Sequence, residues 1–232
     1  IVYWASNCYF KIFEKSKELI EYAEPKQGLA TGKNDIFIRQ WYEVNINTAQ
    51  LNSASVSESK NSNLKWFPYN KGGEFRKWYG NNEYIIDYEH DGKRIKKFHG
   101  STIRNEEYYF KEGVTWSKIT SGNLSARYSP ASHMFDAVGL TCFSQNDINI
   151  YYVLAFLCSK YASYVAQILN PTMSYTVGTI GDIPFIYNNN ENIISLSKQN
   201  LQISRLDWDS HETSWDFQTF PLFSIIPKNH EI

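Results

Sequence analysis

Apolar residues change their spacing along the chain, and the change separates a β-rich part from a helical part. Between residues 64 and 128 they form short aromatic and β-branched runs divided by Gly, Asn and Asp, a pattern that predicts several short strands. Between residues 148 and 169 they recur three or four positions apart, which predicts one buried helix that ends at Asn170 and Pro171. We therefore expect an α+β fold in which a β-rich lobe packs with a few helices.

Flanking segments add further elements to this plan. Helical spacing over residues 9–23, with Asn7 or Ser6 as the cap and Pro25 as the stop, predicts an N-terminal helix. A strand is expected at residues 37–44, a connection rich in Ser and Asn at 45–63, and a hairpin turn at 89–93. A closing strand is expected at 176–186 and an exposed helix at 191–202.

Positive charge is concentrated in the β-rich part, although the whole chain is nearly neutral. Lys and Arg together number 23, and Asp and Glu together number 24. Residues 60–127, however, hold 13 basic and 8 acidic side chains, a difference of +5. An overall basic coat is excluded, but a local basic face can still attract phosphate groups.

The sequence lacks the short motifs of several enzyme and metal-binding classes. It contains no Gly-x-Ser-x-Gly, phosphate-loop or His-Glu-x-x-His motif. The 5 His are scattered and the 3 Cys are unevenly spaced, which predicts neither a zinc site nor a disulfide framework and suits a reducing cytosol. Residues 148–169 carry too many polar side chains for a membrane span. Because the chain opens with Ile-Val-Tyr-Trp, we interpret it as a piece of a longer protein.

Residues 65–80, KWFPYNKGGEFRKWYG, alternate cations with planar rings around a Gly-Gly pair. In such a segment Lys and Arg suit phosphates, Asn suits base edges, and the rings suit stacking. A cluster of rings facing the core, with solvated cations, explains the pattern equally well; its core members would be Trp66, Phe67, Phe75 and Trp78. Lys118 and Arg127, which flank residues 121–123, form a second polar cluster of the same kind.

Several blocks of the sequence resemble the specificity region of PglX-type adenine-specific DNA methyltransferases. These enzymes act in BREX phage-defence systems and are related to large type II restriction-modification enzymes. The resemblance spans nearly the whole chain and rests on residues 37–44 and on the blocks PKQGLATGKN (25–34), KWFPYNKGGEFRKWYG (65–80), RNEEYYFKEG (104–113), ARYSP (126–130), LAFLCSK (154–160), LNPT (169–172) and WDSHETSWDF (208–217).

The resemblance implies a target-recognition domain over residues 25–187, preceded by a helical connector (1–24) and followed by a C-terminal helix and tail (188–232). It also implies an upstream domain that binds S-adenosylmethionine and methylates a flipped adenine. The sequence Asn-Pro-Thr at 170–172 lacks the second proline and the aromatic residue of the catalytic motif. We therefore expect no cofactor and no catalysis in this chain alone. Expected partners are double-stranded DNA, the upstream domain and other defence proteins, in the cytoplasm of a bacterium or archaeon and without a membrane.

Charge and resemblance together predict DNA contacts from the basic, aromatic block. The expected residues are Lys65, Tyr69, Asn70, Lys71, Arg76, Lys77, Lys118 and Arg127, with Lys33 and Arg39 as further candidates. A non-catalytic protein-interaction or carbohydrate-binding module is the alternative, because 17 Tyr and 7 Trp also suit peptides and sugars. Binding that weakens with salt distinguishes the DNA module from that alternative.

Overall fold

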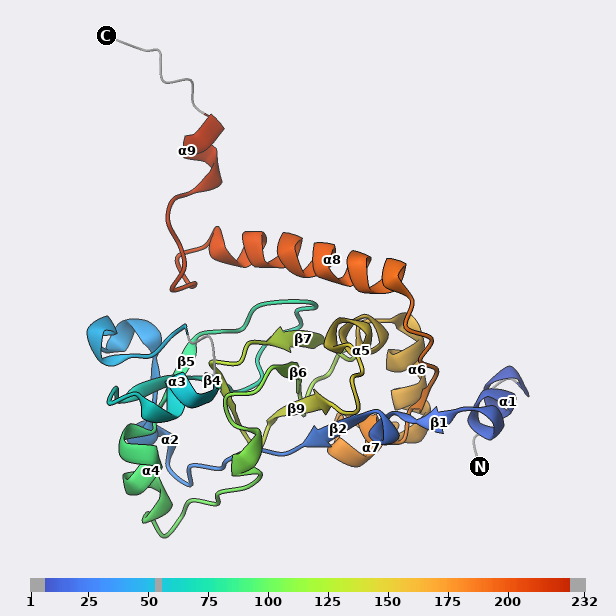
Figure 1. Cartoon of the computed structure of the whole chain (residues 1–232), viewed down its shortest axis with the longest axis horizontal. Helices are drawn as coiled ribbons and strands as arrows, with labels where there is room; N and C mark the ends of the chain where they lie inside the picture. The colour runs from blue at the N-terminus through green and yellow to red at the C-terminus, as the bar shows by residue number, and fades with distance from the viewer. Residues whose placement is uncertain (1–6, 53–55, 226–232) are drawn as a thin grey trace.

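The computed structural model of the chain describes residues 7–52 and 56–225. It confirms the α+β class: the described strands form two four-stranded sheets and one two-stranded sheet, with helices packed around them. In Figure 1 the strands occupy the middle of the molecule, with α5, α6 and α7 on one side and α2 and α4 on the other. Helix α8 lies above β7 and α5 at the top of the view.

The first four-stranded sheet has the order β2-β9-β6-β7 and is antiparallel. Val114 and Trp116 of β6 and Ala126 of β7 are completely buried, and they pack into one core with the following helices. We call this sheet and its helices the first lobe; it consists of β2 (Ala23–Lys26), β6 (Gly113–Ser117), β7 (Ala126–Ser129), β9 (Gly139–Ser144), α5 (Ile150–Leu157), α6 (Lys160–Leu169) and α7 (Val177–Gly181).

The second four-stranded sheet has the order β3-β5-β4-β8, and its last pair is parallel. Phe37, Ile86 and Ile95 meet in its core, and the Phe135 and Phe143 rings, 5.3 Å apart, join this core to β9 of the first lobe. We call this sheet and its helices the second lobe; it consists of α2 (Asn34–Phe37), β3 (Ile38–Gln40), β4 (Trp66–Asn70), β5 (Tyr84–Asp87), α4 (Glu89–Lys96) and β8 (Met134–Phe135).

The N-terminal helix is shorter than predicted, because the chain enters the first lobe early. Helix α1 (Asn7–Lys15) is followed by β1 (Lys17–Glu18), the 3-10 turn η1 (Leu19–Glu21) and β2. Leu19 and Ala23 are completely buried, and this burial outweighs their helical spacing. Pro25 ends no helix; it lies in β2, an edge strand, where a missing N–H is tolerated. The expected domain boundary at residues 24 and 25 falls inside this strand.

The single buried helix predicted for residues 148–169 is two helices in the structure. The axes of α5 and α6 differ by 67°. The Ser159 hydroxyl accepts a hydrogen bond from the Ala162 N–H (3.1 Å) and so caps a new helix at this point. Within the described residues no single helix is long and apolar enough to cross a membrane, although α5 and α6 together meet that criterion by length and composition.

Three further predictions need correction. The strand expected at residues 37–44 is limited to β3, which η2 (Trp41–Glu43) follows. The turn expected at 89–93 is present, with His90, Asp91 and Gly92 in left-handed conformations, but it joins no two strands: it leads into the helical part of α4, where Ile95 is buried in the second core. The first half of the strand expected at 176–186 is α7, which the Thr176 hydroxyl caps by accepting from the Thr179 N–H (3.2 Å). Only β10 (Pro184–Phe185) is a strand, paired with β1.

The helix predicted at residues 191–202 is confirmed, and it continues to Asp209 as α8 (Glu191–Asp209). Its buried residues lie near its two ends: Ile194 and Ser197 in the first half and Trp208 in the last turn. Figure 1 shows α9 (Pro221–Ile225) standing away from the body. The remaining short elements are η3 (Ile46–Thr48), α3 (Val56–Asn61) and η4 (Glu106–Tyr108).

Candidate nucleic-acid interface

Tyr69 and Asn70, both predicted to contact DNA, are buried side chains of β4. The Tyr69 hydroxyl donates to the Leu29 carbonyl (2.8 Å), and the Asn70 amide donates to the Ser129 hydroxyl (2.6 Å). Their exposed fractions are 1% and 5%. In this conformation Tyr69 ties β4 to the Leu29 segment and Asn70 ties β4 to β7 of the first lobe, so both side chains serve the interior of the fold and neither can reach a base or a phosphate.

Arg127 is buried as well, and it has no acidic partner among the described residues. It is 1% exposed, and its Nη1 donates to the Ser125 carbonyl (3.3 Å). Its Nε has no hydrogen-bond partner in the described part of the chain. Burial lowers the pKa of Arg127 to about 10, because a charged group loses hydration inside the protein. The side chain belongs to the interior of β7 and not to a surface.

Lys71 and Lys77 are partly buried and bind groups of the protein itself. The Lys71 Nζ pairs with the Asp136 carboxylate at 3.5 Å. The Lys77 Nζ donates to the Cys158 carbonyl at 2.7 Å, at the C-terminal end of α5. A cation is stabilised there because the last carbonyls of a helix are unpaired and carry partial negative charge. Both lysines therefore attach the segment after β4 to other parts of the fold.

Arg76 attaches the same segment to α8. Its guanidinium lies 4.9 Å from the centre of the Trp208 ring and 3.4 Å from the Asp207 carboxylate. Gly80 leaves room for this contact: a Cβ on Gly80 would lie 3.0 Å from the Trp208 ring and 2.9 Å from the Arg76 side chain. The arginine that the sequence assigns to DNA thus secures the last turn of α8.

Lys118 lies apart, just after β6. Its backbone N–H donates to the Val138 carbonyl (2.8 Å), and its carbonyl accepts from the Tyr175 N–H (2.7 Å). The side chain is partly exposed. The backbone contacts place Lys118 at the end of the first sheet.

Lys65 and Arg39, by contrast, meet at the surface of the second lobe together with an arginine of α4. The carboxylate of Asp87, itself 2% exposed, accepts from the Arg94 Nη1 at 2.9 Å and pairs with the Lys65 Nζ at 3.7 Å. Lys65 and Arg39 both approach the Trp66 ring, at 5.3 and 6.0 Å from its centre. One buried carboxylate and one ring therefore organise cations from three separate segments.

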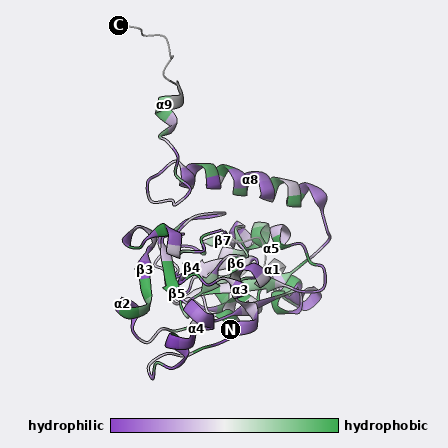
Figure 2. Ribbon diagram, turned by 60° about the vertical axis from the view of Figure 1, so that its left-hand side comes forward, coloured by the Kyte–Doolittle hydropathy of each residue, from purple (hydrophilic) through white to green (hydrophobic). Residues whose placement is uncertain are grey.

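Helix α4 extends this cluster with cations that face solvent. Lys93 and Lys97 are exposed and form no ion pair among the described residues, and they line a shallow hollow of about 310 Å3. Arg94 also covers the Phe37 ring of α2, at 5.5 Å, and Lys33 directly precedes α2. Figure 2 shows α4 as a hydrophilic element at the surface. We define the basic face as Lys33, Arg39, Lys65, Lys93, Arg94 and Lys97.

The cations of α4 were not among the predicted site residues, because residues 89–93 read as a hairpin. His90, Asp91 and Gly92 indeed have positive φ angles of 53°, 56° and 65°, a left-handed turn that starts the element. A Cβ on Gly92 would lie 2.3 Å from the Tyr88 ring, so a glycine is required there. The run KRIKK at 93–97, in which only Ile95 is buried, is the signal that identifies a basic helical face.

The described His, Cys, Asp and Glu side chains and Asn170 were candidates for other chemistry. No group of three or more His, Cys, Asp or Glu in the described ranges could hold a metal ion. Burial raises the pKa of the Cys158 thiol to about 11, so that thiol is unreactive. The Asn170 side chain is engaged locally, donating to the Ser174 carbonyl (2.9 Å) and accepting from the Thr172 hydroxyl (2.8 Å). It is a helix-end residue here, and we assign it no step of a methyl transfer.

Comparison with known proteins shows similarity to adenine-specific methyltransferases over nearly the whole chain. No family model matches the chain. It is 40% identical over 220 residues to the adenine-specific methyltransferase BrxX of Escherichia coli, a match that covers 94% of this chain and 17% of that protein. It is 35% identical over 238 aligned positions to the adenine-specific methyltransferase PglX of Lacticaseibacillus casei, covering 99% of this chain and 20% of that protein. The chain thus spans about a fifth of the length of these relatives, and the predicted resemblance is confirmed: it is a homologue of one region of the PglX and BrxX adenine-specific methyltransferases.

Proposed function

We propose that the chain is the DNA-recognition region of an adenine-specific DNA methyltransferase of a BREX or restriction-modification system. In this proposal the basic face binds the phosphates of a duplex and presents the target to a catalytic domain elsewhere in the parent protein. S-adenosylmethionine binds in that other domain, and methyl transfer takes place there. The similarity to BrxX and PglX supports the reaction, and the basic face supports the DNA contact.

One observation carries the DNA contact: Lys65 and Arg94 meet at Asp87, and Arg39 lies beside the neighbouring Trp66 ring. Around them, Lys33, Lys93 and Lys97 have no acidic partner among the described residues. A phosphate that approaches this surface replaces counterions and breaks no internal ion pair of those three lysines. The predicted residues Lys33, Arg39 and Lys65 belong to this face, whereas Lys71, Arg76 and Lys77 are engaged elsewhere.

The test is a salt series of fluorescence-anisotropy titrations with the chain and a DNA duplex. We expect the logarithm of the affinity to fall linearly with the logarithm of the salt concentration. A triple variant, Lys33→Ala with Lys93→Ala and Lys97→Ala, should reduce the slope by about 0.9 for each phosphate that the variant no longer neutralises. These three side chains have no internal partner among the described residues, so stability should change by less than about 0.5 kcal/mol.

A matched control removes the same charge from a distant surface: Lys11→Ala with Lys15→Ala and Lys160→Ala. All three lysines are exposed, on α1 and at the start of α6. The control should bind duplex with the slope of the unmodified chain. Equally weakened binding in both triple variants would mean that net charge alone drives the interaction, and binding that ignores salt would contradict the proposal.

A second role, contact with another protein domain, is supported by the outer face of α8. Leu196, Ile203 and Leu206 are 57%, 65% and 65% exposed and lie on one side of the helix. Further exposed apolar residues lie in α9 and directly before it: Phe220, Leu222 and Phe223. Such a surface usually contacts a partner, and we propose that the partner is the catalytic domain of the same parent protein. Co-purification of separately expressed parts, abolished by Ile203→Asp with Leu206→Asp, tests this role.

A further inference from the structure

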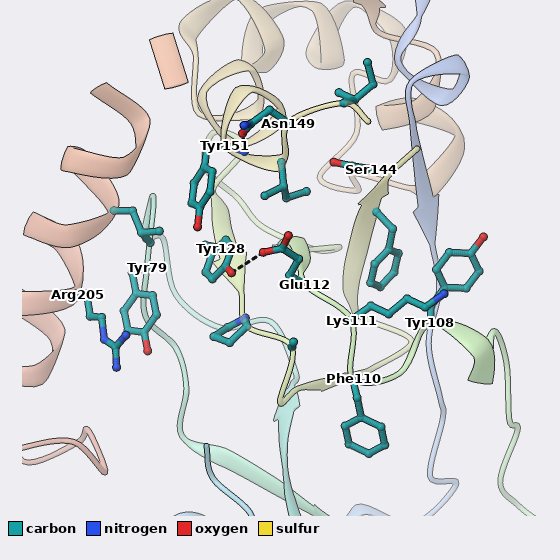
Figure 3. Close-up of a pocket in the computed structure, with 16 residues that line it drawn as sticks. Tyr79, Tyr108, Phe110, Lys111, Glu112, Tyr128, Ser144, Asn149, Tyr151 and Arg205 are labelled. Atoms are coloured by element: carbon teal, nitrogen blue, oxygen red, sulfur yellow. Dashed lines mark hydrogen bonds between the residues drawn. The ribbon is translucent and has the colours of Figure 1, made fainter. Parts of the chain in front are cut away.

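A groove of about 1000 Å3 lies beneath the middle of α8, at the edge of the first lobe (Figure 3). Helix α8 is buried near its ends, through Ile194, Ser197 and Trp208. Between these anchors Leu201 and Arg205 form one wall of the groove. The helix therefore spans an open space instead of filling it.

Aromatic rings line the groove from several elements. Tyr128 of β7 and Tyr151 of α5 are stacked, with ring centres 5.7 Å apart and an angle of 10° between their planes. The Asn149 side chain caps α5 by accepting from the Tyr151 N–H (3.0 Å), which fixes the backbone that carries this ring. Tyr108 and Phe143 form another wall, with ring centres 4.8 Å apart. Planar walls of this kind favour a planar ligand.

Two charged groups at the groove are available to a ligand. The Glu112 Oε2 accepts from the Tyr128 hydroxyl at 2.7 Å, and its Oε1 has no hydrogen-bond partner among the described residues. Figure 3 shows the carboxylate beside the Tyr128 ring, within the space between the walls. The Lys111 Nζ lies 4.9 Å from the centre of the Tyr108 ring and forms no ion pair in the described part of the chain. Arg205 is already paired with Asp209 and Asp216, both at 3.3 Å.

We propose that this groove binds one unpaired, amino-bearing base of a DNA strand, adenine or cytosine. The base packs against the aromatic walls, Glu112 accepts a hydrogen bond from the exocyclic amine, and Lys111 binds the attached phosphate. A carboxylate beside rings also suits a cationic peptide, but the unpaired ammonium of Lys111 at the same groove opposes a second cation. This inference rests on the proposed DNA-recognition function and gives the first lobe a part in it.

The first experiment titrates the chain with free nucleotides by calorimetry, and its result does not depend on duplex binding. We expect dAMP and dCMP to bind more tightly than dTMP. Tyr151→Ala should weaken dAMP binding about tenfold because the ring no longer packs against the base, whereas Tyr42→Ala, at an exposed tyrosine of η2, should have no effect. Glu112→Gln should reduce the preference for dAMP over dTMP, because an amide both donates and accepts.

The second experiment compares a fully paired duplex with duplexes that carry one bulged A, C or T. Tighter binding of the bulged A and C, abolished by Tyr151→Ala, would support the inference. Equal binding of bulged and paired duplexes, with no nucleotide bound in the first experiment, would overturn it and leave the proposed function intact. If no duplex binds but dAMP does, the proposed function fails and the groove stands. Binding of a short Arg-rich peptide in place of dAMP would also overturn the inference.

Discussion

Residues 71–77 and residues 93–97 are both rich in lysine and arginine, but the two regions use these side chains differently. Lys71, Arg76 and Lys77 bind Asp136, Asp207 and the Cys158 carbonyl, and so they connect distant parts of the fold. Within residues 93–97, Arg94 and Lys96 are also ion-paired, but Lys93 of α4 and Lys97 directly after it face solvent without an ion pair among the described residues. A count of charges therefore does not show which cations are available to a phosphate. A lysine or arginine is available only if no acceptor of the protein itself lies within hydrogen-bond distance.

A positive charge without a partner is unfavourable in the protein interior, and His133 is an example. His133 is 3% exposed, and burial lowers its pKa to about 3. The unfolded chain takes up this proton near the ordinary pKa of about 6.5, while the folded chain does not. Its contribution to stability is therefore fully present above about pH 6.5 and is lost as the pH falls toward 3, by at most about 5 kcal/mol.

The largest expected effect is on the pH dependence of stability, and it comes from His133. Urea unfolding of the unmodified chain and of His133→Gln, each between pH 7 and pH 4, should show a smaller loss of stability in the variant. The exposed His99 provides the control, since His99→Gln should lose as much stability as the unmodified chain. Parallel pH profiles for all three proteins would show that other groups dominate acid unfolding.

Removal of the indole that meets Arg76 should have the next largest effect. Trp208 is 3% exposed in the last turn of α8, and Trp208→Ala should cost about 3 kcal/mol through reduced burial and a residual cavity. Limited proteolysis should then cleave α8 before the rest of the chain unfolds. Phe223→Ala, at a ring that is 64% exposed, is the matched control and should leave both readouts unchanged.

Loss of the α4 arginine should disturb the carboxylate beneath it. Arg94→Ala leaves the buried Asp87 with Lys65 alone, at 3.7 Å, and should cost about 2 kcal/mol in chemical unfolding. The double variant Arg94→Ala with Asp87→Asn should be more stable than Arg94→Ala alone, because the second substitution removes the poorly paired charge. Strict additivity of the two changes would contradict the arrangement around Asp87.

The smallest expected effect distinguishes the two regions most directly. Arg76→Ala should lower stability by about 1 kcal/mol, since its ion pair is partly exposed and its contact with the Trp208 ring is modest. It should not change the salt dependence of DNA binding. Lys93→Ala should do the reverse, with a slope smaller by about 0.9 and unchanged stability. If Arg76→Ala changed the salt dependence and Lys93→Ala changed the stability instead, the interface would lie on residues 71–80 and not on α4.

The sequence pattern predicted some elements well because their signals are local. Helix α8 shows helical spacing after an Asn cap, and the buried strand β6 shows alternate apolar residues. At two places where the prediction was wrong, a non-local contact decided the structure. Leu19 enters the first core instead of continuing α1, and Ile95 draws its segment into the second core as a helix. Ser159 is a local cap whose signal was missed within a long apolar run.

Composition and motifs along the chain were enough to predict an α+β fold, an excess of positive charge over residues 60–127, and the resemblance to PglX-type methyltransferases, since each depends on residue type and order alone. The tertiary structure decided which cations are available to a ligand. The acceptors of Lys71, Lys77 and Arg76 lie 65, 81 and 131 positions further along the chain, and no local pattern reveals such a pairing. A lysine or arginine is free for DNA only where the fold brings no such acceptor within reach.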